Sequence, residues 1–194
     1  MARAVGILAL SALLLAPTAG AQAPTLPQVS PELGRVRTAL DRYRDPIAAV
    51  HDGYFSTLVC VAFPRPGGQG QVAYPAGGMG VHFLNPGLIG PQLDTLRPQV
   101  LIYEPDGDRL RLAAAEWFVP TQVSRERPQL FGQPFDGPME GHHPVMPAEL
   151  HHWDLHVWLW KANPEGVFSP TNPSVRCPDR GYSMQEQAPR IVAP

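Results

Sequence analysis

Positive charge is scarce in this sequence and is not concentrated anywhere. Lys161 is the only lysine, and 15 basic against 17 acidic residues give a formal net charge of −2 at pH 7. Nucleic acids and anionic membranes attract proteins through clusters of Lys and Arg, and no such run is present. We therefore exclude nucleic acid as a partner and expect a small molecule or a metal ion instead.

The sequence also lacks a hydrophobic run that could span a membrane. The apolar run Val5–Leu15 is far shorter than the roughly 20 residues that a spanning helix needs. It follows Arg3 and precedes small residues up to Ala21, which is typical of a secretory signal peptide. We predict a signal peptide over 1–21, a flexible lead over 22–30, and a mature protein that is periplasmic or extracellular without membrane insertion.

Several catalytic motifs are missing. There is no G-x-S-x-G nucleophile elbow, no H-E-x-x-H, no P-loop and no C-x-x-C. A Ser-His-Asp triad stays open because its members need not be close in sequence, but nothing selects a serine. A glycosidase that uses Glu104 and Glu116 as its two carboxylates is a further alternative.

Cysteine is limited to Cys60 and Cys177. In an oxidising compartment, two cysteines far apart in sequence most simply form one disulfide. Closing so long a loop stabilises a fold by roughly 4–5 kcal/mol in the chain-entropy model. A metal thiolate and a free thiol are the alternatives to this bridge.

Hydrophobic periodicity predicts one helix followed by several strands. Ser30 and Pro31 are typical of a helix start, and apolar residues then recur at helical spacing as far as Tyr43. Strand patterns follow at 54–63, 77–85, 99–105, 109–120 and 151–160, with a weaker one at 128–135. We expect an α+β fold with an N-terminal helix packed on an antiparallel, barrel-like β-sheet of about five or six strands. This single domain would occupy 31–180, before an irregular tail over 181–194.

Histidines stand at strand positions that point inward. Side chains alternate between the two faces of a strand, so His152, Asp154 and His156 share one face of the 151–160 segment. His82 shares a face with Gly80, which leaves open space for a ligand or another backbone; Met79, Val81 and Phe83 form the other face. A buried imidazole requires hydrogen-bond partners or a metal ion.

Two carboxylates interrupt apolar strands. Glu104 ends the 99–105 segment, and alternation places Glu116 on the same face as Leu110 and Leu112. A carboxylate in that position is costly unless it is paired or coordinated. Imidazole and carboxylate groups from the strands of a small barrel commonly bind a divalent ion and leave a position open for water or substrate.

We therefore predict a mononuclear metal site at which His82 and His156 are completed by Glu116 or Glu104. A loop histidine is a further candidate, and the full set of candidate ligands is His82, His156, Glu116, Glu104 and His142. Asp154 is a candidate to orient a ligand histidine by a hydrogen bond. The expected ion is copper, zinc, iron or manganese.

This site is compatible with a metal-dependent enzyme and with a protein that sequesters metal. An enzyme requires an open coordination position beside a pocket, whereas a closed four-ligand site favours storage. The alternative function is a metal-free module for a small ligand or a partner protein. Its histidines would be hydrogen-bonded in a polar core, and Glu116 would pair with an arginine such as Arg109 or Arg125.

Three segments together resemble a family of secreted bacterial proteins that are generally labelled hypothetical. They are "GMGVHFLNPGL", "RPQVLIYEPDGDRLRLAAAEWFVP" and "DLHVWLWKANPEGVFSPTNPSVRCP", and the resemblance covers about Leu40 to Cys177. It implies that the family pattern includes His82, Asn85, Glu104, Glu116, His156 and the segment "NPEGVFSPTNP". Asn85 thereby joins Asp154 as a candidate supporting residue, whereas the resemblance implies no activity.

Overall fold

The computed structural model describes residue 1 and the ranges 29–67, 73–142, 145–178, 183–185 and 189–193. The predicted signal peptide and most of the predicted lead therefore lie outside the described residues. Helix α1 (Pro31–Leu40) begins as predicted, because the Ser30 hydroxyl accepts a hydrogen bond from the N–H of Leu33 at 3.2 Å. The short helices η1 (Asp41–Arg44) and α2 (Pro46–His51) follow it.

The strands form one curled sheet and a separate hairpin. The seven strands of the sheet are, in spatial order, β7 (Asp136–Met139), β8 (His152–Val157), β4 (Arg109–Pro120), β3 (Val100–Asp106), β2 (Gly77–Leu84), β1 (Phe55–Phe63) and β9 (Ser183–Gln185). Neighbours pair antiparallel, except that β9 is parallel to β1. The α+β class with a barrel-like antiparallel sheet is thus confirmed.

Two small strand elements differ from the sequence prediction. The weak strand expected at 128–135 is instead a hairpin of β5 (Gln129–Leu130) and β6 (Gln133–Pro134), outside the main sheet. Strand β7 was not expected, because glycine and proline occupy its centre and weaken the strand pattern. A short helix, η2 (Pro86–Leu88), follows β2.

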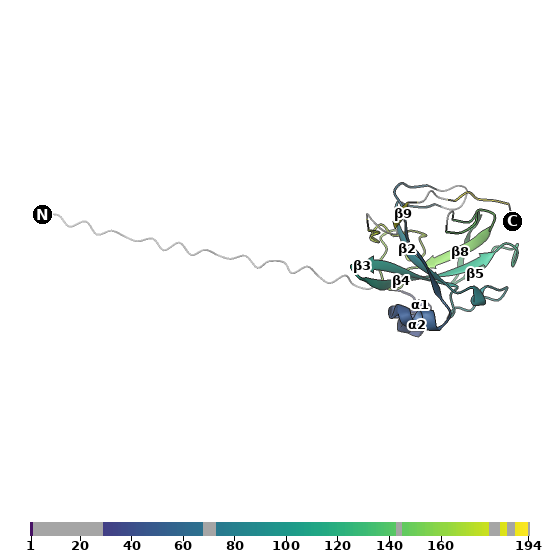
Figure 1. The fold of residues 1–194 in the computed structure, drawn as a ribbon, viewed down its shortest axis with the longest axis horizontal. Coiled ribbons are helices and arrows are strands. Elements are labelled where there is room, and N and C mark those ends of the chain that lie inside the picture. The colour runs from purple at the N-terminus through teal and green to yellow at the C-terminus, as the bar shows by residue number, and fades with distance from the viewer. Residues whose placement is uncertain (2–28, 68–72, 143–144, 179–182, 186–188, 194) are drawn as a thin grey trace.

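The helices cover one face of the sheet, as Figure 1 shows. On that face the apolar side chains of α1 pack in one core with Leu101, Trp117 and Leu155, which come from three neighbouring strands. Because side chains alternate along a strand, Phe118 points to the opposite face, where it belongs to a second apolar cluster with Trp158. The candidate ligands His82, Glu116 and His156 lie on this second face.

A bulge in β4 changes which side chains reach the second face. Pairing with β3 skips Ala113, so the alternation of β4 is interrupted there. Leu110 and Leu112 consequently pack with the helix-covered core. The prediction that they share the face of Glu116 is therefore wrong, and the regular alternation holds only from Ala114 onward.

A second bulge lies in β2. Gly80 has a φ of +87°, and a Cβ at this position would lie 2.5 Å from the carbonyl oxygen of Tyr103. Only glycine tolerates both conditions. The pairing with β1 skips Met79, which consequently lines a cavity together with His82. The prediction that Met79 shares the face of Val81 is wrong for this reason.

The predicted disulfide between Cys60 and Cys177 is present, with the two Cα atoms 5.5 Å apart. It links β1 to the segment after β8 across a sequence separation of 117. The prediction of an irregular tail over 181–194 is wrong in part, because β9 pairs with β1 and Ser183 lies opposite Cys60. The bridge brings the tail to this edge of the sheet. No local sequence pattern predicts that position of the tail.

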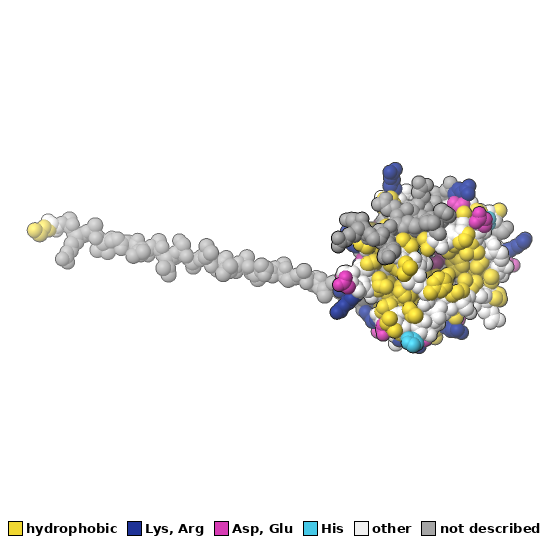
Figure 2. All heavy atoms as spheres, viewed as in Figure 1, with side chains coloured by type: hydrophobic (Ala, Val, Ile, Leu, Met, Phe, Trp, Pro, Cys, Tyr) yellow, Lys and Arg dark blue, Asp and Glu magenta, His cyan; other side chains and the backbone are white. Residues whose placement is uncertain are grey.

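Hydrophobic side chains gather on the face of the molecule that Figure 2 presents, and charged side chains lie mostly around its margin. In the described part of the chain, no helix has the length and apolar character needed to cross a membrane.

Replacing Gly80 by alanine should lower the free energy of unfolding by roughly 1–3 kcal/mol, because a Cβ at positive φ meets a backbone carbonyl. Gly34→Ala in α1 is the matched control. A Cβ there meets nothing within 4 Å, so alanine should raise the free energy of unfolding by up to about 1 kcal/mol. Chemical denaturation measures both effects, and equal stability of the two variants would contradict this account of the bulge.

Candidate metal centre

Three strands each direct one side chain into the same small space. His82 comes from β2, Glu116 from β4 and His156 from β8. Glu116 and His156 are cross-strand partners, so one register positions both. Strand β3 lies between β2 and β4, which places the backbones of His82 and Glu116 roughly 10 Å apart. Their side chains meet because the sheet curls toward this face.

The potential ligand atoms are close together but are not hydrogen-bonded to one another. Oε2 of Glu116 lies 3.6 Å from Nε2 of His82 and 3.6 Å from Nε2 of His156. The two imidazole rings are almost perpendicular, at 88°. One ligand atom from each of the three residues lies within 4.8 Å of the others. A hydrogen bond between such groups is about 2.7–3.2 Å long.

The cluster is shielded from water. The side chain of His156 is 0% exposed, that of Glu116 6% and that of His82 17%. Both ring nitrogens of His156 and Oε2 of Glu116 are buried without a hydrogen-bond partner among the described residues. Buried polar atoms are normally satisfied, because leaving them unpaired costs free energy. This cluster therefore has the properties of a ligand-binding site.

Burial controls protonation within the cluster. Desolvation, followed by the field of His156, lowers the pKa of His82 to about 3. Desolvation also lowers the pKa of His156 to about 4, although the charge of Asp154 acts in the opposite direction. Both imidazoles are consequently neutral at pH 7 and have lone pairs for coordination. Burial, and then the charge of Asp154, raise the pKa of Glu116 well above its ordinary value.

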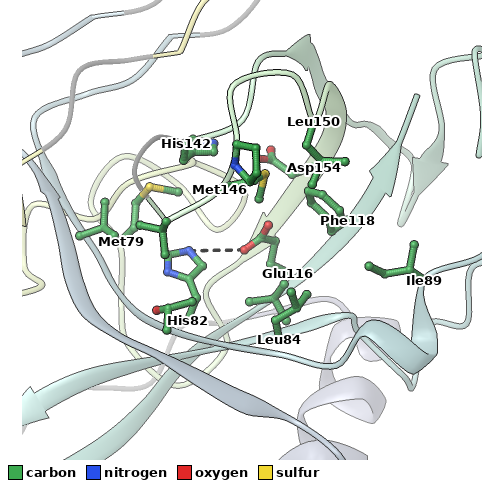
Figure 3. A pocket seen from close by; sticks show the side chains of 15 residues that line it. Met79, His82, Leu84, Ile89, Glu116, Phe118, His142, Met146, Leu150 and Asp154 are labelled. Carbon is green, nitrogen blue, oxygen red and sulfur yellow. Dashed lines mark ion pairs between the residues drawn. The ribbon is translucent and has the colours of Figure 1, made fainter. Parts of the chain in front are cut away.

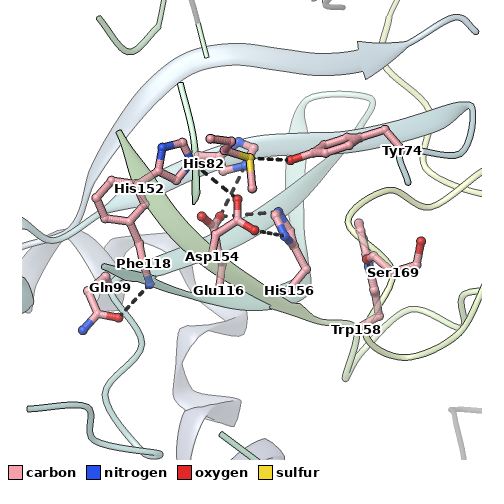
Figure 4. Close-up of polar contacts among 11 residues, drawn as sticks. Tyr74, His82, Gln99, Glu116, Phe118, His152, Asp154, His156, Trp158 and Ser169 are labelled. Carbon is pink, nitrogen blue, oxygen red and sulfur yellow. Dashed lines mark hydrogen bonds and ion pairs between the residues drawn. The ribbon is translucent and has the colours of Figure 1, made fainter. Parts of the chain in front are cut away.

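A second cluster, formed by His142, His152 and Asp154, adjoins the first, and Figure 4 shows Asp154 between His152 and His156. Oδ2 of Asp154 lies 3.6 Å from Nε2 of His152, and Oδ1 lies 3.8 Å from Nδ1 of His156. Burial opposes the charge of Asp154, but the contact with His152 and the fields of the surrounding imidazoles hold its pKa below the ordinary value. Asp154 therefore belongs to the second cluster and also contacts His156 of the first.

Both clusters border a cavity of about 220 Å³, which Figure 3 shows from close by. Four of the potential ligand residues line it: His82, Glu116, His142 and Asp154. Most of the other lining side chains are apolar, including Leu84, Ile89, Phe118 and Leu150. A small molecule in this cavity would meet potential ligand atoms of both clusters.

The structure brings together three of the five predicted ligands, His82, Glu116 and His156, and places His142 in the second cluster. Glu104 is not at the site. Its carboxylate accepts hydrogen bonds from Nζ of Lys161 at 2.7 Å and from the backbone N–H of Arg176 at 3.0 Å. Its charge is satisfied by these contacts, so the prediction of Glu104 as a ligand is corrected.

Of the two predicted supporting residues, one lies at the site and the other does not. Asp154 lies next to the ring of His156, as expected for a residue that orients it. Asn85 instead donates to the carbonyl of Asp52 at 2.8 Å and accepts from the N–H of Gly87 at 3.1 Å, so it caps η2 rather than supporting a ligand. His152 was not among the predicted ligands, although strand alternation places it on the face of Asp154 and His156.

Comparison with protein-family models, with curated proteins and with solved structures finds no match to this chain. The geometry of the two clusters is therefore the basis on which function can be argued.

Replacing Glu116 by glutamine should stabilise the metal-free protein at pH 8 and have a smaller effect at pH 5. The destabilising effect of a carboxyl group with a raised pKa is absent below its unfolded pKa, near 4.5, and grows as pH rises toward its folded pKa. The gain in the free energy of unfolding should be about 1.4 kcal/mol for each pH unit between the unfolded and the folded pKa. Thermal unfolding with a chelator measures it, and a gain that does not depend on pH would contradict the raised pKa.

Proposed function

We propose that this chain is an exported metal-binding protein in which His82, Glu116 and His156 hold one divalent ion in a mononuclear site. One observation carries the proposal. Oε2 of Glu116 and Nε2 of His156 are buried, have no hydrogen-bond partner among the described residues, and lie 3.6 Å apart. A cation bound between them would satisfy both atoms.

The spacing of the three residues supports this proposal. Two ligand atoms that are each about 2.1 Å from one ion, at a tetrahedral angle, lie roughly 3.4 Å apart. The distance of 3.6 Å from Oε2 of Glu116 to each imidazole nitrogen is close to that value. A direct hydrogen bond would be several tenths of an ångström shorter.

A single proton in place of the ion explains these contacts less well. If Glu116 were protonated at Oε2, it could donate to only one of the two imidazoles, and the other contact would have no reason to be equally short. The two distances are both 3.6 Å. This symmetry favours one positive centre shared by all three residues.

The donor set narrows the choice of ion. Two imidazoles and one carboxylate suit zinc, iron, manganese or copper. Both cysteines are joined in the disulfide, so they provide no thiolate. Met79 and Met146 line the adjoining cavity, and because thioethers are soft ligands they favour copper within this group.

The cavity indicates what the ion would do. Three protein ligands leave at least one position of a four-coordinate ion for a further ligand, and His82 and Glu116 both line the cavity. We propose that a small, mostly apolar molecule with one oxygen or nitrogen donor binds there. This arrangement favours a metal-dependent enzyme or a ligand-binding protein over a closed storage site.

Export of the protein is supported by two features. The first 21 residues have the charge, apolar run and small residues of a signal peptide. The Cys60–Cys177 disulfide is of the kind that persists in oxidising compartments such as the periplasm.

Elemental analysis of the mature protein, purified from the periplasm without a chelator or a histidine tag, should find at least one divalent ion per chain. His82→Ala and His156→Ala should each lose an ion, because each removes a ligand from a site with only three. His51→Ala is the matched control, since His51 is exposed at the end of α2 and should retain the full content.

Folding of the variants is checked by circular dichroism, and His82→Gln replaces the alanine variant if that variant unfolds. A folded wild-type protein that binds no ion when supplied with zinc, copper, iron or manganese would overturn the proposal. The histidines would then belong to a metal-free module that binds its ligand in the same cavity.

A further inference from the structure

We propose that His152 and Asp154, with His142, bind a second divalent cation, so that two ions face the same cavity. This inference extends the proposed function. Its three residues are distinct from His82, Glu116 and His156, however, and the evidence for them is independent of the first site.

The hydrogen bonding of His152 shows which of its ring nitrogens is available to bind a cation. Nδ1 of His152 lies 3.2 Å from the carbonyl oxygen of Leu150, and a carbonyl can only accept, so Nδ1 carries the hydrogen. In the neutral ring, Nε2 then bears a lone pair. It lies 3.6 Å from Oδ2 of Asp154, which is also an acceptor. Two acceptors that face each other need a proton or a metal cation between them, and the distance of 3.6 Å is longer than a hydrogen bond, which favours a metal ion.

Both side chains of this pair are shielded from bulk solvent. The side chains of His152 and Asp154 are each 1% exposed. Nε2 of His152 and Oδ1 of Asp154 have no hydrogen-bond partner among the described residues. The carboxylate of Asp154 lies within 3.8 Å of two imidazoles, those of His152 and His156. A buried carboxylate in these surroundings is costly unless it is coordinated.

His142 provides the third ligand from a different part of the chain. Its ring centroid lies 5.3 Å from that of His152, and its ligand atom is within 4.8 Å of those of His152 and Asp154. The backbone before and after it is held in place, because Gly141 donates to the carbonyl of Ala148 and the carbonyl of His142 accepts from Met146. An imidazole pair with one carboxylate is again a donor set for zinc or copper.

Asp154 connects the two sites. With Oδ2 toward His152 and Oδ1 at 3.8 Å from Nδ1 of His156, one carboxylate can bind the second ion and also orient a ligand of the first. A carboxylate that orients a ligand histidine typically changes metal affinity by about 10–100-fold. The geometry thus distinguishes two kinds of variant: loss of His152 affects one site, and loss of Asp154 affects both.

The test is titration calorimetry with zinc on the mature protein after its own metal has been removed. Wild-type protein and His51→Ala should bind two ions per chain. His152→Ala should bind one ion with the affinity of the first site almost unchanged, and His82→Ala should bind one ion at the second site. Asp154→Asn should lose the second ion and weaken the first about 10-fold or more.

The outcomes separate this inference from the proposed function. One ion in the wild type that is lost in His82→Ala but kept in His152→Ala would overturn the second site alone. One ion that is lost in His152→Ala but kept in His82→Ala would support this site and overturn the first. No binding by folded wild-type protein would overturn both. The wild-type stoichiometry requires no variant, and His152→Gln is used if His152→Ala does not fold.

Discussion

The arrangement of this protein depends on one physical constraint: imidazoles and carboxylates buried on the concave face of the sheet need partners for their polar atoms. The helices bury the opposite face by ordinary apolar packing, so they place no such demand on the fold. On the concave face, Glu116, His152, Asp154 and His156 have buried atoms without hydrogen-bond partners in the described part of the chain. The cations that we propose would resolve this constraint at both clusters. Curling of the sheet brings the side chains close enough for such charge to be shared.

Much of the fold could be predicted from the sequence because it rests on local patterns. The cap at Ser30 and the strand of 109–120 were predicted from side-chain chemistry and alternation alone, and both are present as expected. The predictions of side-chain facing are wrong where pairing with a strand distant in sequence determines the local backbone. Ala113 and Met79 are skipped in strand pairing, and each bulge reverses the face of its neighbours. Strand β9 likewise pairs beside the disulfide at Cys60, a neighbour that its own sequence does not predict.

Only part of the site could be predicted from the sequence, because local patterns do not give contacts between distant strands. Alternation identified His82, Glu116 and His156 as inward-pointing, but it could not tell that Glu104 would meet Lys161 after the strand of 152–157 ends. A one-dimensional pattern gives the face of a residue but not its neighbours on other strands. His152 carried the same alternation signal as the predicted residues on its strand, so the second cluster could have been recognised from it.

The most direct test of the central claim is anomalous diffraction from crystals of the mature protein grown with zinc, collected on both sides of the zinc edge. The account predicts an anomalous peak between the two residues, about 2.1 Å from Nε2 of His156 and from Oε2 of Glu116. A direct hydrogen bond between Glu116 and His156, with no anomalous peak beside them in zinc-saturated crystals, would contradict it.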